Sequence, residues 1–66
     1  MNNEKKAEAL LKQTRFLRQS AYKQFCVRCL KEALTAFKRG NKALGTERFH
    51  EAHYAFQRAR ALSQLI

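Results

Sequence analysis

The stretch that decides the fold is residues 45–64, GTERFHEAHYAFQRARALSQ. It opens with a glycine suited to end one helix and a threonine suited to begin the next. Glu47 and Glu51 then place negative charge near the positive end of the expected helix. Residues of an apolar stripe follow at helical spacing, at Phe49, Ala52, Phe56 and Ala59. The pattern predicts an amphipathic helix over residues 47–64, folded back on the preceding helix through a turn at Gly45-Thr46.

The chain before this turn contains no Pro, and its apolar residues repeat at helical spacing from residue 7 onward. The centre of the apolar stripe shifts by roughly 90° near residue 28 if the helix is straight. A break near Gln19-Ser20 would resolve this shift and give helices over about 4–19 and 21–44. One bent helix over 4–44 is the open alternative. We place Gly40 inside the second helix, on the same stripe as Phe37 and Leu44.

Composition supports the same fold class. Ala, Leu, Lys, Arg, Gln and Glu dominate the 66 residues, and these residues form helices most readily. We therefore expect an all-α fold of two or three helices in a single domain, 1–66, with an antiparallel hairpin. A chain this short buries only about 60% of its unfolded surface. Its marginal core makes a homodimer plausible.

The charge is strongly unbalanced. The chain has 14 Lys and Arg against five acidic residues, all Glu, for a formal net charge of +9. A small domain repels itself at this charge density unless an acidic partner neutralises it. The favoured hypothesis is a small non-enzymatic regulatory or accessory protein that binds nucleic acid, RNA or DNA, through a basic helical surface.

The expected basic surface has two parts. The first is a face of the first helix, and Phe16 projects from its basic side, since aromatic rings among cations are what single-stranded nucleic-acid binders use for stacking. The alternative for Phe16 is packing against a partner helix. The cations of this face are Lys5, Lys12, Arg15 and Lys23. The second is a face of the second helix. Its cations are Arg28, Lys31, Lys38, Arg39 and Lys42.

Residues 33–64 resemble a single tetratricopeptide repeat. The positions that carry the resemblance are Ala33, Gly40, Phe49, Ala52, Phe56, Ala59 and Leu62. The chain departs from the repeat pattern at Ala36, Arg39 and Ala43. The resemblance implies a helical hairpin, and arrays of such repeats bind other proteins.

The rival function is accordingly a protein–protein interaction module or adaptor that binds an acidic protein partner. Its interaction or packing face would comprise Phe37, Gly40, Leu44, Phe49, Ala52, Phe56 and Ala59. A third possibility is an amphipathic membrane-surface helix in residues 4–30. A membrane span is not expected, because no apolar run approaches the about 18 residues that one needs.

A zinc site is the remaining alternative for the Cys and His residues. Cys26 and Cys29 form a C-x2-C pair, and His50 and His53 form an H-x2-H pair. A turn at Gly45 would place the two pairs at different levels of the hairpin, roughly 16 Å apart. We therefore expect no metal and predict that the cysteines pack as small apolar residues.

No enzyme or cofactor is expected. The chain has no Gly-rich phosphate loop, no Asp, and little room for a pocket that would hold a catalytic pair. The N-terminus lacks the apolar segment of a secretory signal. Two cysteines in a chain that is not expected to be secreted indicate reduced thiols and a cytoplasmic location.

Overall fold

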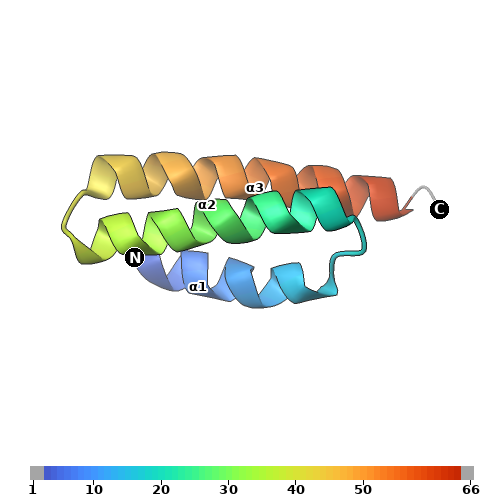
Figure 1. Ribbon diagram of the computed structural model, residues 1–66, viewed down its shortest axis with the longest axis horizontal. Helices are drawn as coiled ribbons and strands as arrows, with labels where there is room; N and C mark the ends of the chain where they lie inside the picture. The colour runs from blue at the N-terminus through green and yellow to red at the C-terminus, as the bar shows by residue number, and fades with distance from the viewer. Residues whose placement is uncertain (1–2, 65–66) are drawn as a thin grey trace.

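The computed structural model describes residues 3–64, which form three α-helices and no strand (Figure 1). Helix α1 spans Asn3–Gln13 and is followed by a 3-10 turn, η1, over Thr14–Phe16. Helix α2 spans Ser20–Lys38, and α3 spans Lys42–Gln64. The predicted all-α fold and its antiparallel hairpin, formed by α2 and α3, are confirmed. Residues 1, 2, 65 and 66 of the predicted 1–66 domain lie outside the described residues.

The predicted turn at Gly45-Thr46 is wrong, because α2 and α3 are joined at Arg39–Asn41. Gly40 has a φ of 82°, a left-handed conformation that glycine adopts without steric cost. The Gly40 N–H donates to the Phe37 carbonyl at 3.0 Å, and the Asn41 N–H donates to the Ala36 carbonyl at 2.9 Å. This pair of bonds is the Schellman arrangement that ends many helices.

Asn41 begins the next helix at the same turn. Its side-chain Oδ1 accepts a hydrogen bond from the Leu44 N–H at 3.2 Å, as an N-cap residue does. Helix α3 therefore starts at Lys42 and runs without interruption through Gly45 and Thr46. The second helix thus ends at residue 38 and not at 44, and the third helix begins at residue 42 and not at 47.

Gly45 serves helix packing instead of the turn. It is buried within α3, and a Cβ atom at this position would lie 2.6 Å from the ring of Phe37. Ala52 and Ala59, both fully buried, follow at intervals of seven residues on the same side of α3. Gly45 and Ala52 lie where α2 comes close to α3: Gly45 lies against Phe37, and the Cys26 thiol donates to the Ala52 carbonyl at 3.3 Å.

The predicted break between the first two helices is confirmed, and the single bent helix over 4–44 is not present. The first helix is shorter than predicted, since α1 ends at Gln13 and η1 ends at Phe16. The Thr14 hydroxyl donates to the Leu11 carbonyl at 2.6 Å, and Leu17 then adopts an extended conformation. Gln19 occupies the N-cap position of α2 and makes no side-chain capping bond.

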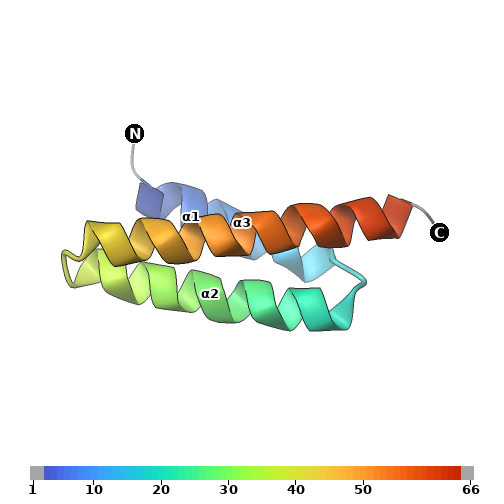
Figure 2. The same ribbon diagram turned by 90° about the horizontal axis from the view of Figure 1, so that it is seen from above.

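Helix α1 packs against one side of the α2–α3 hairpin (Figure 2). Its buried side chains are Ala7 and Leu10, and they join a core with α2 and α3 residues. The core members from the hairpin are Cys26, Cys29, Leu30, Ala52, Ala55 and Phe56. The helices build an elongated molecule of 40 × 20 × 15 Å, with the opposite side of the hairpin uncovered by α1.

Candidate nucleic-acid interface

The charges are segregated along the long axis of the molecule. The five acidic residues are Glu4, Glu8, Glu32, Glu47 and Glu51. Residues 9–31 and 52–64 contain no Asp or Glu but eight cations: Lys12, Arg15, Arg18, Lys23, Arg28, Lys31, Arg58 and Arg60. These two segments lie toward the end of the molecule where α1 joins α2 and where α3 finishes (Figure 1). Most of the net positive charge therefore lies toward that end.

Four cations lie on and beside the connection between α1 and α2. We call this group the basic corner and define it by Lys12, Arg15, Phe16, Arg18 and Lys23. The chain reversal brings Lys23 back to the end of η1, where its Nζ donates to the Arg15 carbonyl at 3.3 Å. The predicted grouping of Lys12, Arg15 and Lys23 thus arises from this contact between two helices, and not from one continuous helical face.

Phe16 is the most exposed large apolar side chain of the described residues, with 86% of its surface accessible. It follows Arg15 in η1, and the chain leaves η1 in an extended conformation at Leu17. The other reading of Phe16, packing against a neighbouring helix, does not fit this exposure. Its ring is therefore available to a ligand at the basic corner.

Three further predicted cations lie outside the corner. Lys5 is exposed on the outer side of α1, two turns before Lys12. Arg28 and Lys31 are exposed on the solvent side of α2 and border a shallow surface depression with Ser20 and Gln24. This solvent side of α2 extends the positive surface away from the corner.

Lys38, Arg39 and Lys42 gather around the turn at the opposite end of the molecule, and all three are exposed. Lys38 and Arg39 lie at the carboxyl end of α2, where cations interact favourably with the helix dipole. Their position therefore has a structural explanation within the fold. The predicted second basic face is divided between this end and the middle of α2.

An acidic cluster occupies the part of the hairpin nearer to the turn. The Arg48 guanidinium lies 3.2 Å from Glu32 and 2.6 Å from Glu51, and it donates a hydrogen bond to the latter. This hydrogen bond and the negative charge of Glu51 raise the pKa of Arg48. Two carboxylates around one guanidinium leave a net negative charge here, which disfavours this region as a phosphate contact.

The predicted interaction face lies mostly inside the chain. Ala52, Phe56 and Ala59 are buried, and Phe37 and Phe49 are half-buried. Gly40 is exposed in the turn, and Leu44 is exposed beside it. These residues therefore do not form one continuous accessible surface.

The four residues considered for zinc also do not gather. The predicted separation of the Cys pair and the His pair along the hairpin is wrong. Because the turn is at Gly40, Cys29 lies near the level of Glu51. Both thiols are nevertheless buried, whereas His50 and His53 are exposed and lie near the ring of Phe49. No group of three or more metal-ligating side chains occurs within residues 3–64.

Burial keeps the two thiols protonated. Desolvation, followed by the charge of Cys29, raises the pKa of Cys26 to about 11. Desolvation and the carboxylate of Glu51 raise the pKa of Cys29. Because the thiolate is the reactive form of cysteine, neither residue is suited to nucleophilic or redox chemistry at neutral pH.

This burial makes a pH-dependent prediction. In a Cys29→Ala variant, where desolvation is the remaining cause of the shift, thiolate absorbance should show Cys26 ionising above the pKa of about 9 that it has in the urea-unfolded chain. A raised pKa in the folded state means that the contribution of Cys26 to stability is complete below pH 9 and is lost as the pH rises to about 11. A native midpoint below pH 9 would contradict the buried position.

Sequence reasoning missed three cations of the positive end. Arg18, Arg58 and Arg60 were not assigned to either basic face, although all are exposed. The available signal was the complete absence of acidic residues from 9–31 and 52–64. The turn at Gly40 brings the two segments to the same end of the molecule.

No helix within residues 3–64 has the length and apolar content needed to cross a membrane. Comparisons of the chain with family models, with curated proteins and with solved structures found no match. The resemblance to a tetratricopeptide repeat stays a prediction.

Proposed function

We propose that this protein is a small non-enzymatic accessory or regulatory protein that binds single-stranded nucleic acid at the basic corner. The observation that carries the proposal is the exposed ring of Phe16 among four cations, in a part of the chain without acidic residues. Cations would contact the phosphates, and the ring would stack on a base. RNA and DNA share both features, so either is a ligand of this chemistry.

The geometry of the corner supports simultaneous contact with several phosphates. Lys12 and Arg15 come from α1 and η1, and Lys23 comes from the first turn of α2, at the positive end of the helix dipole. Helix α2 has no acidic residue in its first turn and no side-chain cap. Cations at such a position repel the helix dipole, and a bound phosphate would remove this repulsion.

Titration of the protein with labelled random-sequence RNA and DNA at two salt concentrations tests the proposal. Four phosphate contacts give a slope of log affinity against log salt of about −3 for a single strand. Affinity should therefore fall about 50-fold between 50 and 200 mM salt. The Lys12→Glu/Arg15→Glu variant should bind at least about 30-fold more weakly at the lower salt and show a shallower slope.

The Lys38→Glu/Arg39→Glu variant is the matched control, since it makes the same change in net charge at the other end of the molecule. It should retain affinity within a few-fold, with helicity of both variants checked by circular dichroism. Phe16→Ala should weaken binding about 5- to 100-fold, whereas Phe16→Tyr should retain it. The proposal fails if the wild-type protein does not bind at low salt, or if both double variants lose affinity equally.

A further inference from the structure

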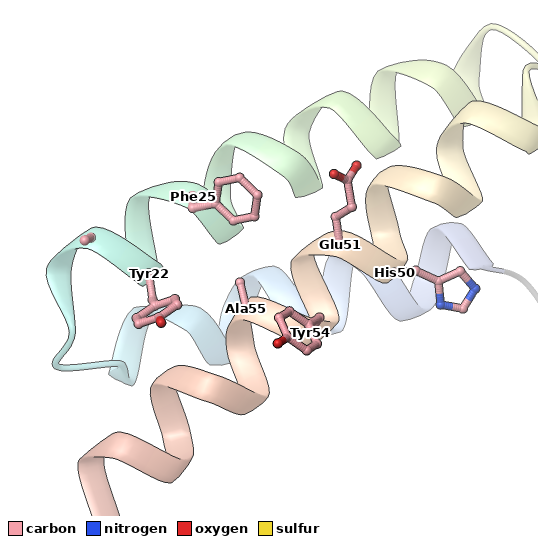
Figure 3. A pocket seen from close by; sticks show the side chains of 7 residues that line it. Tyr22, Phe25, His50, Glu51, Tyr54 and Ala55 are labelled. Carbon is pink, nitrogen blue, oxygen red and sulfur yellow. The ribbon is translucent and has the colours of Figure 1, made fainter.

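The uncovered side of the α2–α3 hairpin carries an aromatic groove (Figure 3). Helix α1 passes behind the hairpin in this view and contributes no residue to the groove. Its apolar walls are Tyr22 and Phe25 of α2 and Tyr54 and Ala55 of α3. Phe25 is 43% exposed and Tyr54 is 66% exposed. Tyr and Phe side chains are enriched at the centres of protein–protein interfaces.

Charged residues are ordered along α3 on both sides of this groove. Glu47 and Glu51 precede Tyr54 on this side of the helix, and Arg58 follows it by about one turn. The Glu32–Arg48–Glu51 cluster has a net negative charge, and Glu47 adds a further negative charge beside it. Arg58 makes no ion pair with any residue of the described range. The groove is thus flanked by negative charge on one side and by an unpaired cation on the other.

This order of charges is complementary to itself when α3 of a second copy lies antiparallel to α3 of the first. Glu51 lies three residues before Tyr54, and Arg58 lies three residues after Ala55. A two-fold axis beside Tyr54 and Ala55 would therefore place each Glu51 opposite Arg58 of a second copy. A parallel arrangement would place like charges together and is disfavoured. The position of this axis is close to the middle of α3, so the two molecules would overlap along nearly their whole length.

From this juxtaposition we propose that the aromatic groove is the interface of an antiparallel homodimer with two-fold symmetry. Tyr54 and Phe25 of each copy pack across the axis, and two Glu51–Arg58 pairs flank them. Isologous pairing of this kind closes as a dimer and does not extend into a filament.

The proposal does not rest on nucleic-acid binding. The corner residues Lys12 and Arg15 belong to α1 and η1, on the other side of the hairpin, and they stay accessible in the dimer. Because the two copies are antiparallel, their basic corners would lie toward opposite ends of the dimer. A failed dimerisation test leaves the binding test unaffected, and the reverse also holds.

Sedimentation equilibrium of the full chain, from about 10 µM to 1 mM, tests the dimer. The wild-type protein should shift from its 7.7 kDa monomer to twice this mass across the range. Arg58→Glu should raise the dissociation constant about 10-fold or more, because it places a carboxylate opposite Glu51. The charge exchange Glu51→Arg/Arg58→Glu should restore dimerisation to within about 3-fold of the wild type.

Arg60→Glu is the matched control, since it makes the same charge change on the side of α3 that faces α1. It should leave the dissociation constant unchanged, and Tyr54→Ala should raise it about 10-fold or more. Circular dichroism of each variant verifies that the helices are intact. The proposal is overturned if the wild-type protein is still a monomer at 1 mM. It is also overturned if Arg58→Glu and Arg60→Glu raise the dissociation constant equally, or if the double variant dimerises no more tightly than Arg58→Glu.

Discussion

Leu30→Ala should leave much of the protein unfolded at 37 °C. Leu30 is the largest fully buried side chain, at 0% exposure, and lies where α2 joins the common core. Replacing a buried leucine by alanine costs about 2–5 kcal/mol, since the apolar contacts are lost and a cavity remains. A chain of this length has a total stability of roughly 3–10 kcal/mol. Urea unfolding followed by circular dichroism measures the loss.

Leu44→Ala provides the control for this substitution. The chemical change is identical, but Leu44 is 38% exposed beside the turn. We expect a cost below about 1 kcal/mol, because water already reaches much of the side chain. Equal costs at positions 30 and 44 would contradict the observed core.

Added side chains at the two glycines should destabilise the protein to different extents and for different physical reasons. Gly45→Leu should cost about 3 kcal/mol, because even a Cβ atom at this position would overlap the ring of Phe37. At Gly40 no atom lies within 4 Å of the added Cβ, and the cost arises only from its φ of 82°. Gly40→Ala should therefore lose about 1 kcal/mol. Urea midpoints of the two variants measure this difference.

A D-alanine substitution separates the two causes. D-alanine favours positive φ, so at position 40 it should stabilise the chain by about 0.5–1 kcal/mol. At position 45, in a right-handed helix, D-alanine should destabilise it. The exposed Ala43→Leu substitution in α3 should change stability by less than about 0.5 kcal/mol. A stabilising D-alanine at 45 and a destabilising one at 40 would restore the turn that the sequence predicted.

Helical content, the break before Ser20 and the hairpin could be predicted because each follows from local patterns. The turn could not, because two glycine pairs with similar local chemistry lie five residues apart. Gly40-Asn41 and Gly45-Thr46 both combine a helix-ending glycine with an N-capping residue. Packing decides between them, since only a helical Gly45 lets Phe37 approach α3. The recurrence of small residues at 45, 52 and 59 was the sequence signal for this contact.

The candidate site was predictable in composition but not in arrangement. An excess of cations and the ring of Phe16 are visible in the sequence. Their segregation depends on which residues of α2 and α3 lie at the same level, and an error of five residues in the turn changes that level by about 7 Å in each helix. Arg58 and Arg60 were therefore not connected with the positive end, and the aromatic groove between α2 and α3 was not foreseen.

The position of α1 has a consequence for the order in which the molecule opens. Helix α1 packs mainly on α2 and only lightly on α3. It is thus the segment that should detach first, and its amide hydrogens should exchange with solvent sooner than those of residues 26–33. Lys12 and Arg15 would leave with it, whereas Lys23 stays on the hairpin. The lifetime of the docked helix consequently sets how long the cations from the two segments remain together.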